Sequence, residues 1–175
     1  WEGEGPDGIV YKGPAHPISA DEEQMRLVRG DAYAWRLSMR YSQDLLGEDF
    51  ARLAFVEQRG GSDREHIASR PEFLGDVILG RKDAPASYHV AVVQDDALQK
   101  VTQVIRGEDL RASTHVHVLL QKLLGLPTPT YRHHVLLTGP DGKRYAKRDR
   151  ALTLAALREA GVSPADIRAR IGLRA

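Results

Sequence analysis

The feature that most limits how this chain can fold is the alternation of strand-like and helix-like segments between residues 76 and 139. Four runs rich in apolar and β-branched residues are predicted to be strands: 76–83, 87–96, 101–107 and 131–139. The second of them, "SYHVAVVQDD", has a nearly continuous apolar centre, which is typical of a strand with both faces covered. Between the last two, residues 108–125 place leucines at largely helical spacing. This alternation predicts an α/β fold.

The regions on either side are predicted to be less regular. Residues 1–18 are rich in Gly and Pro and are expected to form a loop, after which Ser19 caps a short helix over 20–29. The glycine pair at positions 60 and 61 predicts an irregular loop that runs to residue 72. The remaining elements predicted are strands over 32–39 and 52–58, a helix over 151–160, and a final helix with Ser163 as N-cap and Pro164 at its first position.

Length and composition bound the class of protein. A chain of 175 residues fits one domain, or one domain with a small appendage. Its 42% hydrophobic and 28% charged residues are typical of a globular protein in water. No apolar run approaches the roughly 20 residues that span a bilayer, and no signal peptide is visible, so we expect no membrane partner and a cytoplasmic location. The absence of cysteine excludes disulfides and thiolate zinc sites.

A dense cluster of basic side chains follows a turn near the C-terminus. The stretch "TGPDGKRYAKRDRAL" (138–152) places four of them within six positions: Lys143, Arg144, Lys147 and Arg148. From residue 143 to residue 174 there are nine basic side chains and three acidic ones, a local net charge of +6, whereas the whole chain carries +1. This asymmetry predicts an anionic partner, such as a nucleotide phosphate or an RNA backbone. The alternative is a solvated hairpin tip followed by an arginine-rich helix surface.

Arg106 is predicted to lie at the carboxyl end of a strand, just before a glycine turn and a helix. Ligands bind at that edge of open α/β sheets, and a guanidinium there can hold a carboxylate with two parallel hydrogen bonds. A structural ion pair with Glu108 or Asp109 is the alternative. Tyr88 and His89 are predicted to face opposite sides of the preceding strand, and Tyr88 is either a binding residue or a core aromatic residue.

The histidine spacing argues against a metal site. His115 and His117 are two residues apart on a predicted helix, which separates them by about 200° around the axis. His133 and His134 face opposite ways on a predicted strand. We therefore expect no bound metal. The chain also has no Walker loop and no nucleophile elbow.

Two long stretches, "SYHVAVVQDDALQKVTQVIRGEDLRAST" and "LLGLPTPTYRHHVLLTGPDGKRYAKRD", resemble the glutamyl-tRNA synthetase family. They look like the second half of its class I, Rossmann-type catalytic domain, over about residues 74–150. Within the family the chain is most similar to the shortened paralogue, glutamyl-Q tRNA(Asp) synthetase, because it ends soon after the basic loop and because "PDGIVYKGPAHPIS" resembles the paralogue's insertion. Many members carry a cysteine zinc knuckle there; Ala15 occupies the position of its last cysteine, so no zinc is expected.

The resemblance implies three regions and an activity. Residues 1–70 would be an insertion and connective region that is zinc-knuckle-like but lacks the cysteines. Residues 71–150 would be the second half of the Rossmann-type domain, and 151–175 a small helical C-terminal piece. The implied activity is the ligase reaction that activates glutamate with ATP, with Mg²⁺ as the ATP counter-ion, and attaches the glutamate to the queuosine base of tRNA(Asp).

The resemblance also implies site residues. Tyr88 and Arg106 fall on the positions that bind glutamate. The segment from Arg144 to Arg148 falls on the family's KMSKS loop, in which the second lysine, Lys147 here, stabilises the ATP phosphates as pyrophosphate leaves. Ala146 replaces the serine of that motif, a departure that puts loop closure and rate in question. The other residues implied to lie on the ATP side are Arg144, Glu108 and Asp109.

A HIGH motif, which contacts the ATP phosphates in class I synthetases, does not occur in the sequence. We therefore expect the first half of the catalytic domain to lie upstream of Trp1, and we expect the 175 residues alone not to form aminoacyl-adenylate. Two alternatives stay open. The chain could be a fragment of a glutamyl-tRNA synthetase that charges tRNA(Glu), or a non-catalytic, RNA-binding relic.

Overall fold

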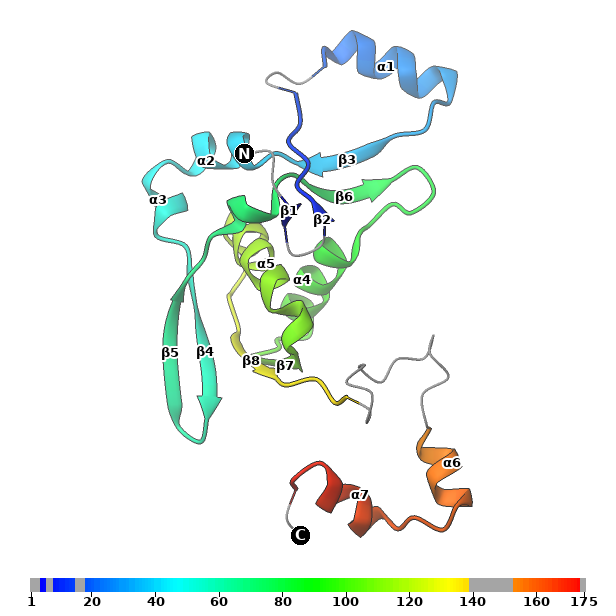
Figure 1. Ribbon diagram of the computed structural model, residues 1–175. Helices are drawn as coiled ribbons and strands as arrows, with labels where there is room; N and C mark the ends of the chain where they lie inside the picture. Colours follow the sequence, from blue (N-terminus) through cyan, green and yellow to red (C-terminus); the bar gives the residue numbers. More distant parts are fainter. Residues whose placement is uncertain (1–3, 6–7, 15–17, 139–152, 174–175) are drawn as a thin grey trace. The chain divides into compact units, whose positions relative to one another are not determined.

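The structure is a computed structural model that describes the chain except for residues 1–3, 6–7, 15–17, 139–152 and 174–175 (Figure 1). The chain forms two compact units, Trp1–His134 and Val135–Ala175. No helix in the described part of the chain is both long enough and apolar enough to cross a membrane.

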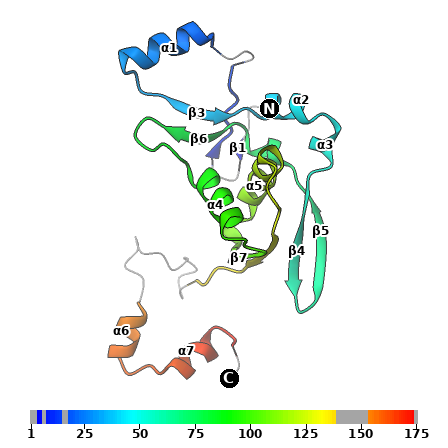
Figure 2. The same cartoon turned by 180° about the vertical axis from the view of Figure 1, so that it is seen from behind.

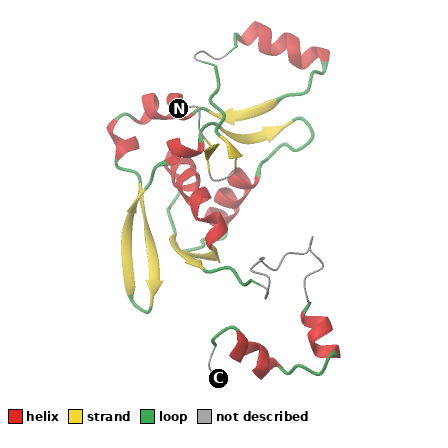
Figure 3. Ribbon diagram, in the orientation of Figure 1, coloured by secondary structure: helices red, strands yellow, loops and turns green. Residues whose placement is uncertain are grey.

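The first unit contains a four-stranded sheet with strand order β5-β4-β8-β7, whose strands are labelled in Figure 1 and drawn in yellow in Figure 3. Strand β4 (Ala54–Gly60) pairs antiparallel with β5 (Asp63–Ala68) and parallel with β8 (Thr130–His134). Strand β8 also pairs parallel with β7 (Gln103–Gly107). The sheet is therefore mixed and mostly parallel, and together with its helices it confirms the predicted α/β class.

Two helices that pack against each other accompany this sheet, α4 (Tyr88–Leu98) and α5 (Arg111–Leu124) (Figure 2). The predicted helix over 108–125 is confirmed as the short 3₁₀ turn η2 (Glu108–Leu110) followed by α5. Helix α5 ends at Gly125, whose left-handed backbone closes the helix as expected. The residues of the buried apolar core are Met39, Phe50, Leu53, Phe55, Val93, Val116, Val118, Leu119, Leu120 and Tyr131.

The rest of the first unit is built from shorter elements. Helix α1 (Ala20–Arg29) is capped by the Ser19 side chain, as predicted. Strands β3 (Ala34–Leu37) and β6 (Val77–Arg81) form an antiparallel pair. The other elements are β1 (Glu4–Gly5), β2 (Gly8–Ile9), α2 (Met39–Leu46), α3 (Glu48–Ala51) and the 3₁₀ turn η1 (Pro71–Leu74).

The second unit contains α6 (Leu154–Glu159) and α7 (Pro164–Arg170). Ser163 and Asp166 form a reciprocal capping box at the start of α7, and Pro164 occupies its first turn. This confirms the predicted helix start, because the sequence places a hydroxyl acceptor, a proline and an acidic residue where a helix N-terminus can use each of them.

One strand prediction is wrong: residues 87–96 do not form a strand but begin α4. A short apolar run is compatible with a buried strand or with one side of a helix, so the pattern alone does not separate them. Packing against α5 selects the helix. Val93 is buried on one side of α4, whereas Leu98 is 69% exposed on another side. The rest of the protein therefore covers only part of the surface of α4.

The loop predicted over 60–72 is also wrong, because β5 forms a hairpin with β4. Gly60 pairs with Asp63, which leaves Gly61 and Ser62 as the two-residue connection. Gly61 has a positive φ of 54°, as tight hairpin turns require. The glycine pair therefore reverses the chain within a sheet instead of ending the regular structure.

Candidate active site

Strand register brings the side chains of Arg106 and His133 together. In the parallel pair β7–β8, Arg106 lies opposite His133, and Val104 lies opposite Tyr131. Side chains alternate along a strand, so these two pairs form successive layers on one face of the sheet. The Tyr131 and His133 rings accordingly stack with centroids 6.2 Å apart. The Arg106 guanidinium Nε donates to His133 Nε2 over 3.3 Å.

Helix α5 supplies two further partners of Arg106. Thr114 and His117 are three residues apart, so they lie on one face of this helix. Arg106 Nη2 donates to the Thr114 hydroxyl over 2.6 Å, and Arg106 Nη1 lies 3.2 Å from His117 Nδ1. Both Thr114 and His117 are almost completely buried. The guanidinium is therefore clamped between a strand neighbour and a helix.

Helix α4 adds Tyr88. Its hydroxyl accepts from Arg106 Nη1 over 3.4 Å, and its ring packs edge-on against that of His117. The structure thus brings Tyr88 and Arg106 together, although Tyr88 begins a helix and not the predicted strand. Tyr88 is 50% exposed, so it is not a core residue.

The hydrogen bonds of Arg106 in the described part of the chain end on Tyr88, Thr114, His117 and His133, and none ends on Glu108 or Asp109. The ion pair considered as the alternative role for Arg106 is thus not formed among the described residues. Both acidic residues lie in η2, directly after β7.

A buried acidic residue completes the cluster. Glu57 on β4 accepts from His133 Nδ1 over 3.0 Å, and its other oxygen forms an ion pair with Arg111 at 2.9 Å that lacks hydrogen-bond alignment. Burial raises the pKa of Glu57, but the His133 hydrogen bond and the Arg111 charge outweigh it, and the net shift is downward. Burial is also the main reason why the pKa of His133 is lowered. The pair therefore consists of an ionised carboxylate and a neutral imidazole.

His117 is held neutral even more strongly. Burial, with smaller effects of the nearby Arg106 and His89, lowers its pKa to about 3. Its Nε2 lies 3.0 Å from His89 Nδ1. Sequence reasoning considered His117 only as a metal ligand and did not consider Thr114 or Glu57. The sequence did contain one signal for two of these residues: Thr114 and His117 are three positions apart on the helix that follows Arg106, so they share a helix face.

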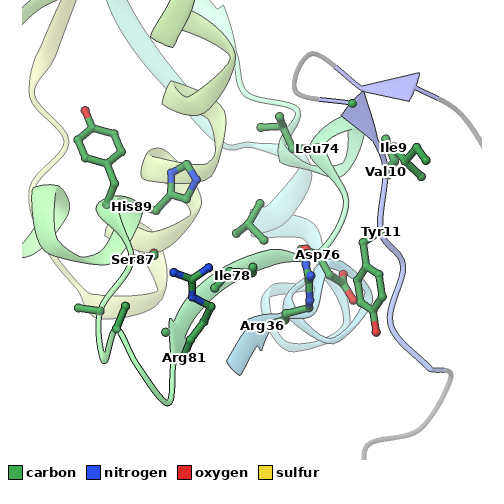
Figure 4. A pocket seen from close by; sticks show the side chains of 16 residues that line it. Ile9, Val10, Tyr11, Arg36, Leu74, Asp76, Ile78, Arg81, Ser87 and His89 are labelled. Atoms are coloured by element: carbon green, nitrogen blue, oxygen red, sulfur yellow. Dashed lines mark hydrogen bonds between the residues drawn. The ribbon is translucent and has the colours of Figure 1, made fainter. Parts of the chain in front are cut away.

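A cavity of about 620 Å³ borders this cluster (Figure 4). Tyr88 and His89 belong to both the cluster and the cavity wall. Ser87 also lines the cavity, and its buried hydroxyl oxygen has no hydrogen-bond partner among the described residues. The opposite wall comes from β2, the segment that follows it, and β6. The cavity therefore offers space for a polar ligand directly beside Arg106's partners.

The two predicted ATP-binding residues of the basic loop, Arg144 and Lys147, lie outside the described residues. Within the described residues, no group of three or more His, Asp or Glu side chains could hold a metal ion. His115 and His117 make separate contacts, His115 with the backbone N–H of Arg70 and His117 with Arg106, as their angular separation on a helix predicted.

Comparison with known proteins decides the family. A family model described as "tRNA synthetases class I (E and Q), catalytic domain" matches residues 61–175. The chain belongs to this family of class I synthetases. The resemblance seen in the sequence is thereby confirmed, and Arg106 with its partners Tyr88, Thr114, His117 and His133 lies within the matched residues.

The synthetase relatives include two proteins called glutamyl-Q tRNA(Asp) synthetase. The one from Rhodobacter capsulatus is 44% identical over 173 residues, which is 97% of this chain and 58% of that protein. The one from Symbiobacterium thermophilum is 38% identical over 164 residues, which is 91% of this chain and 47% of that protein. A glutamate tRNA ligase structure from Elizabethkingia meningosepticum, in complex with its amino acid, is 27% identical with a TM-score of 0.44, over 75% of this chain and 31% of that one. The chain thus spans about half the length of the curated relatives that it matches.

Proposed function

We propose that the protein containing this chain activates glutamate with ATP and attaches it to the queuosine base of tRNA(Asp). Two relatives that match more than nine tenths of the chain are glutamyl-Q tRNA(Asp) synthetases. The observation that carries the proposal is the Arg106 guanidinium, which is clamped at the carboxyl end of β7 beside Tyr88, a residue that also lines the cavity. A fixed cation in such a place suits an acidic amino acid.

The chemistry assigns a role to Arg106. In the activation step the α-carboxylate of glutamate forms a bond to the α-phosphorus of ATP while the bond to the departing pyrophosphate breaks. Since the α-carboxylate reacts, the side-chain carboxylate is the group left for Arg106 to hold. Tyr88 orients that carboxylate from the neighbouring helix. Arg106 thereby selects an acidic side chain over an apolar one.

In this proposal the basic loop, Arg144 to Arg148, acts on ATP. Lys147, with Arg144, neutralises the charge that develops on pyrophosphate as it leaves. Glu108 and Asp109 would repel phosphate directly, so their role on this side is toward the Mg²⁺ counter-ion of ATP or the ribose hydroxyls. A Lys147→Ala substitution is expected to lower kcat for activation by about 10²-fold with little change in the KM for glutamate.

The proposal is tested in the intact protein by glutamate-dependent ATP–pyrophosphate exchange and by transfer of labelled glutamate to tRNA(Asp) with and without queuosine. Arg106→Ala is expected to lower kcat/KM for glutamate by at least about 10²-fold, because a charged contact in a partly buried site is lost. Arg132→Ala is the matched control, since Arg132 is exposed and adjacent to His133 on β8 but points to the other face of the sheet.

A second candidate has a specific observation in its favour. A protein from Alkalilimnicola ehrlichii called glutamate–tRNA ligase 2 is 34% identical over 154 residues, which is 88% of this chain and 30% of that protein. If the intact protein charges tRNA(Glu) and not tRNA(Asp), it is a glutamyl-tRNA synthetase and the proposed activity on queuosine is wrong. If Arg106→Ala leaves every activity unchanged and only salt-sensitive RNA binding is found, the non-catalytic reading holds.

A further inference from the structure

The hydrogen bonds of Arg106 determine which nitrogen of each neighbouring histidine carries the proton. A guanidinium is always charged and can only donate, so every ring nitrogen that it contacts must accept. Arg106 Nε contacts His133 Nε2. His133 therefore keeps its proton on Nδ1, where the Glu57 carboxylate accepts it over 3.0 Å. The two contacts agree, because a carboxylate needs a donor.

The same reasoning applies to His117. Arg106 Nη1 contacts His117 Nδ1, so that nitrogen accepts and the proton of His117 lies on Nε2. This proton is donated to His89 Nδ1 at 3.0 Å. His89, which lines the cavity, consequently accepts at Nδ1. A chain of hydrogen bonds runs from Arg106 through one buried imidazole to the cavity wall.

Arg106 has more N–H groups than these protein partners use. A guanidinium has five N–H groups. His133, Thr114 and His117 take one each, from Nε, Nη2 and Nη1. Two remain, one on each terminal nitrogen, and the one on Nη1 makes only the long 3.4 Å contact with Tyr88. One N–H on each terminal nitrogen is what a bidentate carboxylate requires.

We propose that His117 and His133 are positioning residues, each held as a single neutral tautomer, which fix Arg106 so that two N–H groups and its full charge are left for a substrate carboxylate. The proposal rests on the proposed function, in which that carboxylate belongs to glutamate. Neither histidine touches the substrate. They act through Arg106, and His133 is itself held by Glu57.

The neutral partners of Arg106 affect how well the site distinguishes a carboxylate ligand from the corresponding carboxamide. The groups that clamp Arg106 orient its guanidinium without cancelling its charge, and the Glu57 charge is matched by Arg111. The acidic side chain of α4 that interacts with Arg106 is Asp96, whose pKa is raised chiefly by burial, although the Arg106 charge opposes that shift. A carboxylate therefore meets a cation whose hydrogen-bond partners are neutral, whereas a carboxamide gains no such attraction.

The tautomers are measured directly in the intact protein labelled with ¹⁵N-histidine. Long-range ¹H–¹⁵N spectra distinguish a protonated Nε2 from a protonated Nδ1, and the His117→Asn and His133→Asn spectra assign the signals. We expect His117 to be neutral with its proton on Nε2 and His133 neutral with its proton on Nδ1 at pH 7. The opposite tautomer, or a charged ring, at either position overturns the proposal. This reading does not depend on any enzymatic activity.

Two variants of one position test the positioning role. The Asn oxygen in His117→Asn can take the place of Nδ1 and still accept from Arg106, whereas His117→Gln places its amide at the Nε2 end and removes that acceptor. We expect His117→Gln to raise the KM for glutamate about tenfold while the KM for ATP stays within about twofold. The increase in the KM for glutamate should be several-fold smaller in His117→Asn. His66→Gln, on exposed β5, is the control. Equal effects of Asn and Gln overturn the positioning role.

A failure of the proposed function would give different experimental results from a failure of the positioning role. If the intact wild-type protein shows no glutamate-dependent exchange, the activity is refuted while the NMR spectra still decide the tautomers. Because His117 is buried, His117→Gln is accepted only if its circular dichroism matches that of the wild type. Thr114→Val, which removes the Nη2 acceptor at similar volume, supplies the second variant and is expected to raise the same KM.

Discussion

At the scale of single residues, the molecule keeps several titratable side chains away from water. His115, His117 and His133 all have lowered pKa values, in each case chiefly because burial disfavours the charged ring. Glu57 has a lowered pKa as well, since His133 and Arg111 outweigh the cost of its burial. The polar cluster is therefore built for neutral histidines and an ionised glutamate, a state that acid removes.

The stability of the protein is expected to depend on pH through His117. Its folded pKa of about 3 lies below its ordinary value of 6.5, so between these limits the unfolded chain binds the proton and the folded protein does not. Stability is thus expected to fall as the pH drops below about 6.5, by up to about 1.4 kcal/mol per pH unit from this residue. The free energy of unfolding in urea at pH 7.0 and pH 5.5 measures the loss, roughly 1 kcal/mol for His117.

The variant His117→Asn cannot titrate and should show a correspondingly smaller loss over that interval. Glu57 does not interfere, because its lowered pKa makes its contribution present above its ordinary value of 4.5 and lost only in more acidic solution. An unchanged pH dependence in His117→Asn would contradict the assignment of a buried neutral His117.

At the scale of elements, turns and packing decide what the apolar pattern leaves open. The β4–β5 hairpin depends on Gly61, which has a positive φ of 54° and open space, with no neighbouring atom within 4 Å, where a side chain would begin. The cost of a side chain there is therefore backbone strain and not a clash. Its neighbour Gly60 has the same open surroundings but no positive φ.

Gly60 and Gly61 form a matched pair for testing the turn conformation. Gly61→Ala is expected to lower the free energy of unfolding by about 1 kcal/mol, because an L-residue in the left-handed region is strained. Gly60→Ala should change it by less than about half of that. Chemical denaturation of the two variants beside the wild type provides the measurement. Equal destabilisation would show that the turn conformation is not the cause.

At the scale of the first unit as a whole, Asp76 ties together three distant parts of the chain. Its carboxylate accepts from the backbone N–H of Gly13 and from that of Met39, each over 2.8 Å. Its own N–H donates to the Tyr11 carbonyl, and its carbonyl accepts from Arg36, which lies over the Tyr11 ring (Figure 4). One residue thus joins the N-terminal segment, the start of α2 and the start of β6.

Substitutions of Asp76 test the strength of this junction. Asp76→Ala is expected to cost about 2–3 kcal/mol, because two backbone donors lose a charged acceptor. Asp76→Asn should cost nearly as much, since one of its two amide positions becomes a donor that faces a donor. Asp83→Asn, an exposed change, is the control and should stay within about 0.5 kcal/mol. Thermal unfolding of the intact proteins checks all three, and a mild effect of Asp76→Ala would rule out the junction.

Much of the architecture and part of the site followed from local signals in the sequence. Ser19 and Ser163 mark helix starts because a side-chain oxygen satisfies an otherwise unpaired N–H wherever the helix lies in the fold. Arg106 was placed at a strand's carboxyl end, beside Tyr88, from short-range pattern and family resemblance. These features depend on a few neighbouring residues, which the sequence shows directly.

Other features were decided only by tertiary structure. Residues 88–98 form a helix, and not a strand, because α5 covers one of their sides. The Arg106 cluster joins Glu57 to His133 across 76 positions through the register of parallel strands. The sequence alone determined where α1 and α7 start, since a helix start depends on local hydrogen bonding, and it placed Arg106 at the end of a strand. Which side chains surround Arg106, and in which protonation state, depended on long-range packing that removes water from groups far apart in the chain.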